Sequence, residues 1–362
     1  FLTGALCLWM GFMRVGEKGG AVNILSRLVA PLFRKLFPEV PADHPAVGSM
    51  MMNFSANMLG LDNAATPLGL KAMKELQELN PEPEKATNAQ IMFLVLNTSG
   101  LTLIPVSILA YRSVAGSTAP SEVFLPILLA TFCSTIIGML YVSIRQKVDL
   151  FHPVILGYLG GLIAFVAGLL YFVWHYPEST ATISNVGGNL LLILIIAAFL
   201  IMAMRKKVNV YEEFIEGAKG GFEVAITVVP YLVAMLAALA IFRTSGALNE
   251  VLRGIEYTLV FMGISATEFV EALPVALMKP FSGSGARGLM LEVFETHGVD
   301  SFAGKVAATF QGSTETTFYV LAVYFGSVGV KNTRYAAGAG LIADLAGIIA
   351  AIFISYLFYS VS

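Results

Sequence analysis

Seven consecutive small or polar residues, Gln311 to Thr317, interrupt a segment that is otherwise apolar enough to lie in lipid. The runs on either side, Val306–Ala308 and Phe318–Leu321, are hydrophobic. A bilayer interior offers no water to unpaired polar groups, so such a block must face protein or a wet cavity. Glu315 makes the constraint strongest, because a carboxylate at that depth is costly unless it is paired or protonated. The chain is therefore expected to build a polar site inside a membrane.

The composition predicts an all-α, polytopic integral membrane protein. Of the 362 residues, 57% are hydrophobic and 13% are charged, whereas a soluble domain carries about 25% charged residues. The net charge of −2 is uninformative about nucleic acid, but the sequence has no basic tail or arm, so nucleic acid is not an expected partner. No histidine has a companion ligand at metal spacing, so neither a metal nor a cofactor is expected. Phe1–Met13 is too short to span a bilayer, and the first half of the chain is expected to be incomplete at its start.

Along the chain, uninterrupted spans alternate with interrupted ones. Uninterrupted spans are predicted at Ser121–Ile144, His152–Trp174, Ser184–Met204, Phe222–Phe242 and Tyr335–Tyr359. Broken or re-entrant segments are predicted at His44–Leu79, Ala89–Val114, Gly263–Leu291 and Phe302–Gly326. Two segments are amphipathic, as is typical of interfacial helices: Ala21–Phe37 and Tyr211–Ala218. An external loop is expected at His175–Thr182, and the basic links Arg145–Lys147 and Arg205–Lys207 are expected in the cytoplasm.

The interrupted segments recur in the same order in both halves of the chain. A shift of 214 residues lays Asn97–Ser99 on Gln311–Ser313, and a shift of 219 lays Asn63–Gly69 on Ser282–Gly288. Basic residues place the link after the second interrupted span inside, whereas the link after the first is expected outside. The sequence therefore predicts two related, inverted repeats with a site at their interface, which is the architecture of secondary transporters.

The polar residues of these segments are the candidate binding site. Neutral hydrogen-bonding groups dominate among them, which suits a small polar solute. The predicted substrate-binding residues are Asn53, Asn57, Asn63, Thr66, Asn97, Thr98, Ser99, Glu271, Ser282, Ser284, Arg287, Gln311, Ser313, Thr314, Glu315 and Thr316; Glu268 and Asp344 are predicted to contribute to coupling. The alternative for any single Ser or Thr is helix-to-helix hydrogen bonding, and for Arg287 a purely structural Arg–Glu pair.

Enzymatic function is not expected. Gly283-Ser284-Gly285 lacks the Lys-Ser/Thr ending of a phosphate-binding loop. No histidine lies near a candidate nucleophile within the spans, and no His-Glu-x-x-His helix is present.

Several long motifs resemble a known family. Gly60–Met73 and Leu96–Ser99 resemble spore maturation protein A, and Leu273–Gly288, Thr309–Tyr319 and Ala343–Gly347 resemble spore maturation protein B. The resemblance implies a fused A–B protein of the nucleoside-recognition, or gate, domain group. That group is related to concentrative nucleoside transporters and to the gate regions of a ferrous-iron transporter. Gly312–Glu315 is similar to the Gly-Gln-Thr-Glu signature of the nucleoside transporters, with Ser313 in place of Gln, which implies a nucleoside-binding role for Glu315.

Together these features predict a transporter that moves a small polar solute, with a nucleoside as one option, by alternating access in the bacterial inner membrane. The alternative is a membrane ligand sensor or a scaffold for envelope or spore maturation. Expected partners are the lipid bilayer, the solute and a coupling ion or proton, and a homo-oligomer is compatible with the sequence. The predicted units are an A-like repeat at residues 1–147, a linking helix and external loop at 148–183, and a B-like repeat at 184–362.

Overall fold

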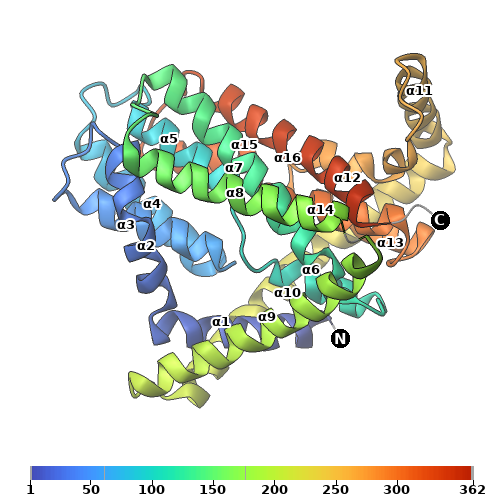
Figure 1. Ribbon diagram of the computed structural model, residues 1–362, viewed down its shortest axis with the longest axis horizontal. Helices are drawn as coiled ribbons and strands as arrows, with labels where there is room; N and C mark the ends of the chain where they lie inside the picture. Colours follow the sequence, from blue (N-terminus) through green and yellow to red (C-terminus); the bar gives the residue numbers. More distant parts are fainter. Residues whose placement is uncertain (1, 61, 176, 360–362) are drawn as a thin grey trace.

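The computed structural model describes residues 2–60, 62–175 and 177–359, and within these ranges the protein is built from helices without a β-strand (Figure 1). The helices are α1 (Leu2–Gly19), α2 (Ala21–Leu36), α3 (Pro45–Met58), α4 (Asp62–Glu78), α5 (Asn88–Thr98), α6 (Val106–Val114), α7 (Phe124–Gln146), α8 (Pro153–His175), α9 (Pro177–Arg205), α10 (Val210–Thr244), α11 (Ala247–Phe261), α12 (Leu273–Met278), α13 (Gly283–His297), α14 (Phe302–Ser313), α15 (Thr317–Ser327) and α16 (Ala336–Phe358). Two short 3-10 turns, η1 (Pro120–Val123) and η2 (Glu268–Ala272), precede α7 and α12. The all-helical prediction is confirmed.

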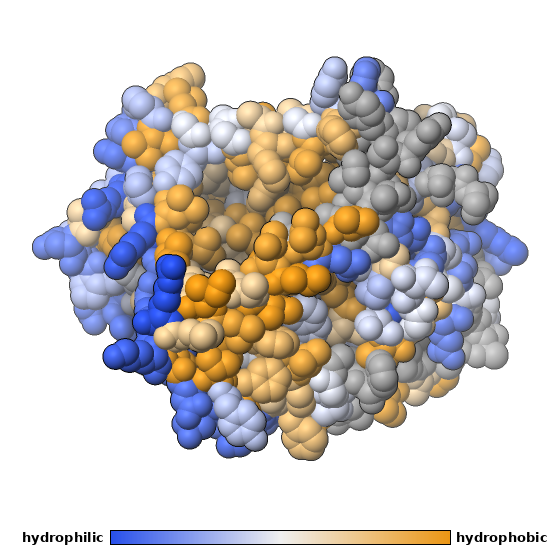
Figure 2. Space-filling model, turned by 60° about the horizontal axis from the view of Figure 1, so that its bottom comes forward, coloured by the Kyte–Doolittle hydropathy of each residue, from blue (hydrophilic) through white to orange (hydrophobic). Residues whose placement is uncertain are grey.

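Three helices of the described chain are long and apolar enough to cross a membrane. They are Pro120–Gln146, which joins η1 to α7, Pro153–Phe172 within α8, and the whole of α16. The first of these is largely buried inside the protein, whereas α8 exposes most of its apolar surface. An exposed apolar helix of this length is stable only against lipid, so the protein is a membrane protein. Figure 2 shows hydrophobic side chains gathered across the middle of one face, with hydrophilic ones mainly towards its edges.

One predicted boundary is wrong. The external loop expected at His175–Thr182 is replaced by the start of α9 at Pro177, because the fixed φ of proline suits the first position of a helix. The amphipathic segment Tyr211–Ala218 leads directly into the predicted span Phe222–Phe242, since both belong to the single helix α10. A Cβ at Gly217 would lie 2.4 Å from the Met10 carbonyl oxygen in α1. Glycine in the middle of α10 therefore allows close helix packing and does not mark a break.

The helices form two groups that α2 connects. In Figure 1, α1, α9 and α10 lie together at the bottom, and α5, α7, α8, α15 and α16 lie at the top. Helix α1 packs against α9 and α10, and α16 packs against α7 and α14. Small residues allow these contacts: a Cβ at Gly16 would lie 2.5 Å from the ring of Phe199, and one at Gly347 would lie 2.7 Å from the Thr314 methyl group.

Helices α5 and α6 follow each other along the chain, as do α14 and α15, and the outer ends of these two pairs meet at opposite ends of the molecule. At one end of the molecule, Gln146 Nε2 donates to the Asn88 carbonyl at the start of α5 (2.8 Å) and to the Tyr335 hydroxyl that precedes α16 (3.0 Å). The Lys331 N–H, which follows α15, donates to the Glu84 carbonyl, which precedes α5 (2.9 Å). At the other end, the end of α6 contacts the loop before α14 through Arg112. The start of α5 therefore lies beside the end of α15, and the end of α6 lies beside the start of α14.

Candidate functional site

The site begins at two interruptions in apolar helices. Helix α5 ends at Thr98 and its continuation α6 begins at Val106, while α14 ends at Ser313 and α15 begins at Thr317. The predicted breaks at Asn97–Gly100 and within Gln311–Thr317 are thus confirmed. The two interruptions touch, because the Glu315 N–H donates to the Thr98 carbonyl at 2.9 Å. We call this contact between the two interruptions the crossing.

Gly100 makes this crossing possible. Its φ of +62° is in the left-handed region, and a Cβ there would lie 2.9 Å from the Glu315 nitrogen. Only glycine combines that backbone conformation with such a close approach of another chain segment. The crossing therefore depends on a local property of the first interruption.

Several predicted site residues serve the broken helix ends. A helix end leaves carbonyl groups without partners, and these are costly in a buried place. Thr98 Oγ1 donates to the Val95 carbonyl (3.1 Å), and Ser99 Oγ donates to the Leu96 carbonyl (3.1 Å). Ser313 Oγ likewise donates to a carbonyl of α14, at 3.0 Å. These three side chains are buried and do not line the cavity described below, so the structure gives them a backbone-bonding role.

Each interruption is held by a helical hairpin. The first hairpin pairs α3 with α4, and the second pairs η2 and α12 with α13. The Leu103 N–H donates to the Met58 carbonyl of the first hairpin at 2.7 Å, and the Phe318 N–H donates to the Pro280 carbonyl of the second at 2.9 Å. Both predicted re-entrant segments are therefore hairpins whose tips bond to an interrupted helix.

A cavity of about 510 Å³ lies between these hairpin tips and the crossing. Pockets that bind small molecules have volumes of about 300–1,000 Å³, so this one has room for a metabolite. The structure brings most of the predicted binding residues to its wall: Asn57, Thr66, Asn97, Ser282, Ser284, Arg287, Gln311, Thr314, Glu315 and Thr316. It also adds Tyr111, Lys279 and Tyr324, which sequence reasoning missed.

Of these three residues, only Lys279 could have been recognised from the sequence as a candidate for the site. Lys279 is a cation inside an apolar hairpin and is 6% exposed, which marks it as a functional candidate in a membrane. Tyr111 and Tyr324 lie among other apolar and aromatic residues of α6 and α15, and nothing in the sequence distinguishes them. Tyr324 joins three elements, since its hydroxyl accepts from Asn53 Nδ2 (3.3 Å) and donates to Asn97 Oδ1 (3.5 Å).

Other predicted residues lie away from the cavity wall. Asn53 is fully buried and donates to the Ala65 carbonyl at 2.8 Å, which ties α3 to α4. Glu271 is half exposed and pairs with His297 at 3.0 Å, and Glu268 accepts from the Tyr356 hydroxyl at 2.6 Å. Asp344 in α16 is 2% exposed and accepts from Thr317 Oγ1 at 2.7 Å, directly behind the second interruption. The side chain of Asn63 lies outside the described part of the chain.

The cavity wall presents two charged side chains without an ion pair and one buried polar atom without a hydrogen-bond partner, among the residues that the structure describes. Within the part of the chain that the structure describes, neither Arg287 nor Glu315 forms an ion pair, so the structural Arg–Glu pair that was the alternative for Arg287 is absent there. The Arg287 guanidinium lies over the Tyr111 ring, 5.4 Å from its centroid. Gln311 is 6% exposed, and its Oε1 atom has no hydrogen-bond partner. Buried polar groups are normally hydrogen-bonded, so this wall is suited to a ligand that supplies the missing partners.

A second cavity of the same volume lies between α1, α2, α4 and α10. Its charged groups are already paired: Arg14 bonds Glu17 at 3.2 Å and Glu213 at 3.1 Å, and Glu216 bonds Lys219 at 2.9 Å. Because its charges compensate one another, this cavity has less to offer a polar ligand.

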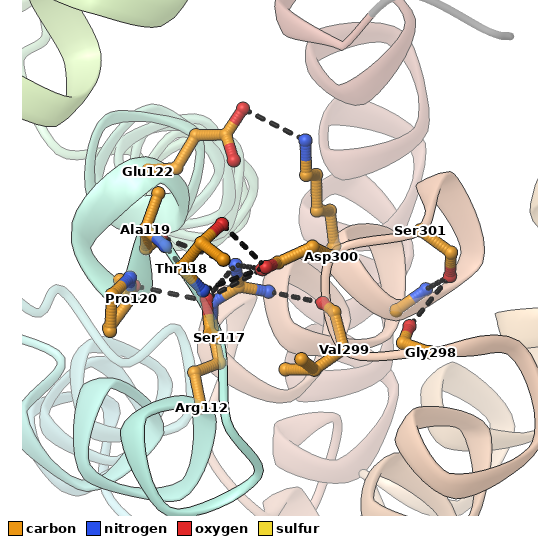
Figure 3. A network of polar contacts seen from close by, with 12 residues as sticks. Arg112, Ser117, Thr118, Ala119, Pro120, Glu122, Gly298, Val299, Asp300 and Ser301 are labelled. Atoms are coloured by element: carbon orange, nitrogen blue, oxygen red, sulfur yellow. Dashed lines mark hydrogen bonds and ion pairs between the residues drawn. The ribbon is translucent and has the colours of Figure 1, made fainter.

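A polar network also joins the end of α6 to the loop before α14 (Figure 3). The Arg112 side chain is completely buried and donates to Asp300 Oδ1 (2.9 Å) and to the Val299 carbonyl (2.8 Å). The same carboxylate accepts from Ser117 Oγ (2.6 Å) and from the N–H (2.8 Å) and hydroxyl (2.9 Å) of Thr118. Burial alone raises the pKa of Asp300, but the bonds from Ser117 and Thr118 and the charge of Arg112 outweigh it and hold this pKa below its ordinary value. The network fastens the two interrupted helices together at one end.

Comparison with known proteins identifies the family of the chain. The family model described as nucleoside recognition, Gate, matches residues 2–117. Spore maturation protein B of Bacillus subtilis (strain 168) is 45% identical over 166 residues, which cover 46% of this chain and 91% of that protein. Spore maturation protein A of the same strain is 44% identical over 135 residues, which cover 37% of this chain and 69% of that protein. No solved structure matches. The chain therefore belongs to the family of spore maturation proteins A and B, and it joins relatives of both in one polypeptide.

Proposed function

We propose that this protein is a secondary-type transporter that carries a small polar solute by alternating access around the cavity at the crossing. The observation that carries the proposal is the cavity wall itself, where Arg287 and Glu315 form no ion pair among the described residues and Gln311 Oε1 has no hydrogen-bond partner. A buried acceptor such as Gln311 Oε1 costs free energy unless a ligand satisfies it. The matching family model is described as nucleoside recognition, so nucleosides are the first solutes to test. We propose binding and transport and no catalysis, and neither histidine nor cysteine lines the described cavity.

The arrangement of the interrupted helices supports alternating access. Helices α5 and α6 start near Gln146 and end near Asp300, whereas α14 and α15 start near Arg112 and end near Glu84. The two interrupted helices thus run in opposite directions and cross at their interruptions. This is the relation expected of inverted repeats, in which one repeat moves against the other around a fixed midplane site.

Basic residues support a multi-pass orientation in the inner membrane. Arg145 and Arg334 both lie against the Tyr335 ring, each 5.3 Å from its centroid, at the end of the molecule where α7 finishes. Lys331 follows α15 at the same end. Because short cytoplasmic links carry excess Lys and Arg, we propose that this end faces the cytoplasm.

Two carboxylates are proposed for different roles. Glu315 lines the cavity and is proposed to bind the solute, as its likeness to the nucleoside transporters' signature implies. Asp344 lies behind the second interruption and bonds Thr317, so protonation or ion binding there would alter the start of α15. We therefore propose Asp344 as the residue that couples solute movement to a proton or ion, in preference to the exposed Glu268.

The experiment is uptake of uridine and adenosine into liposomes that contain the purified protein. Glu315→Gln keeps the shape of the side chain and removes its charge, and a hydrogen bond to a charged group contributes about 1.5–3 kcal/mol. Uptake is therefore expected to fall about 10- to 100-fold. Glu78→Gln, an exposed residue at the end of α4, serves as the matched control and is expected to leave uptake unchanged.

Equal uptake by the Glu315→Gln variant and the control would contradict the site assignment. Solute binding without flux would favour the alternative function, a membrane sensor. Thermal shift measured on the same preparations separates these results, because it reports binding whether or not transport follows.

A further inference from the structure

The first turn of α13 opens into the cavity. Ser282, Gly283 and Ser284 line the wall, and Ser282 Oγ accepts from the Gly285 N–H at 3.0 Å. The first N–H groups of a helix have no acceptor within it, and Ser282 satisfies one of them. Helix α13 is 15 residues long, so it presents the remaining donors and the positive end of its dipole to the cavity.

Arg287 adds a full positive charge on the same face of this helix. It follows Ser284 by three residues, which places the two side chains next to each other. Its guanidinium lies over the Tyr111 ring and has no carboxylate partner among the described residues. Lys279, the other cation on the wall, already has an interaction within the protein. A guanidinium fork matches the two oxygens of a carboxylate or a phosphate.

Two acceptors line the same cavity. Gln311 Nε2 donates to the Gly283 carbonyl at 3.4 Å, which fixes the orientation of the amide and leaves Oε1 as the atom without a partner. With Gln311 only 6% exposed, water has little access to satisfy that atom. Glu315 lines the same wall, and its carboxylate also forms no ion pair among the described residues. These two acceptors call for N–H or O–H donors on the ligand.

From this geometry we infer that the cavity selects small organic acids that also carry hydrogen-bond donors. The acidic group, a carboxylate or a phosphate, binds Arg287 and the start of α13, and the donors bind Gln311 Oε1 and Glu315. A neutral solute leaves Arg287 without a counter-charge, and an inorganic anion without donors leaves the two acceptors unsatisfied. The inference rests on the proposed function and deepens it, because it names the class of solute for the same cavity.

Two pairs of probes differ only in the acidic group: uridine with uridine 5′-monophosphate, and uracil with orotate. Affinities are measured by calorimetry on the full chain in detergent and again in nanodiscs of phosphatidylcholine alone, which removes anionic lipid headgroups as competitors. The acidic member of at least one pair is expected to bind about 10-fold or more tightly than its neutral partner. Inorganic sulfate, an anion without hydrogen-bond donors, is expected not to compete.

Variants at Arg287 identify the source of the preference. Arg287→Gln is expected to lower affinity for the acidic probe about 10- to 100-fold and to leave the neutral probe unchanged. Arg287→Lys keeps the charge without the fork and is expected to retain part of the preference. Arg34→Gln, at an exposed position in α2, is the control. Gel filtration and melting temperature establish that each variant is folded.

Equal affinity for both members of each pair would overturn the inference, and so would an equal loss for both members in Arg287→Gln. Tight binding and uptake of the neutral probes alone would overturn it as well, while the transport proposal would stand. Conversely, binding of the acidic probe without uptake would support the inference and contradict transport.

Discussion

Replacing Asp300 by Asn tests the network that fastens the two interrupted helices at their outer ends. The carboxylate accepts from Arg112 and Ser117 through Oδ1, and from the N–H and hydroxyl of Thr118 through Oδ2. An amide oxygen can keep the first two bonds, but the amide nitrogen would face the Thr118 N–H, donor against donor. Arg112, whose side chain is completely buried, would also lose its carboxylate partner.

The magnitude follows from these contacts. Hydrogen bonds to a charged group contribute about 1.5–3 kcal/mol each, and the equivalent of two is lost. Asp300 is 31% exposed, so water compensates part of the loss, and we expect the free energy of unfolding to fall by about 3 kcal/mol. With an unfolding entropy of about 2.1 cal/mol/K per residue, that corresponds to about 4 °C in melting temperature for a chain of this length.

The assay is thermal unfolding of purified protein in detergent, followed by intrinsic fluorescence. Asp43→Asn is the control, because Asp43 is an exposed aspartate in the loop before α3, and its melting temperature is expected to change by less than about 1 °C. A melting temperature for Asp300→Asn that matches the control would refute the reasoning, since it would mean that the network contributes nothing beyond a surface ion pair.

Two further predictions are tested by melting temperature and, for the second, also by the calorimetric affinity for the solute. The folded-state pKa of Asp300 is below its ordinary value of 3.8, so the contribution of this carboxylate to stability is complete above pH 3.8 and is lost as the pH falls through the folded pKa. Acidification below about pH 4 should therefore lower the melting temperature of the unmodified protein more than that of Asp300→Asn. Parallel pH profiles of the two proteins would contradict this. Gly100→Ala and Gly116→Ala both place a Cβ at positive φ, but only at Gly100 does it approach another segment, 2.9 Å from the Glu315 nitrogen, whereas nothing lies within 4 Å at Gly116. Both should lose about 1 kcal/mol from backbone strain, and Gly100→Ala alone should also weaken solute binding by displacing Glu315; equal effects of the two substitutions on binding would show that the crossing does not position the site.

The interrupted helices could be predicted because a polar run inside an apolar span has few structural solutions in a membrane. Both breaks therefore occur where Asn97–Gly100 and Gln311–Thr317 suggested. The partition of polar residues within each break could not be predicted. Thr98, Ser99 and Ser313 donate to helix carbonyls, whereas Thr314 and Thr316 reach the cavity wall. Which side chains reach the cavity depends on the residue at which each helix ends, and a shift of that end by one residue would change the set.

Charged residues were harder to place from sequence than uncharged ones. Glu268 and Glu271 precede α12 in a hydrophobic context that suggested burial, yet η2 turns them outward to meet Tyr356 and His297. Their partners come from distant parts of the chain, and no local pattern encodes such a contact. Similarly, the loop expected after α8 is wrong because Pro177 starts a helix, and proline is compatible with both a turn and a helix start.

The bond between the Glu315 N–H and the Thr98 carbonyl has an evolutionary consequence, since both of its atoms belong to the main chain. Exchange of the side chain at position 98 or 315 leaves both atoms in place, apart from proline at position 315, provided that Gly100 is kept. The wall residues around it, by contrast, can each be exchanged by a single mutation. Divergence can therefore change which solute the cavity accepts while the two interruptions stay in register. A scaffold with this property can acquire new solute specificities while it keeps the main-chain contact that positions the binding site.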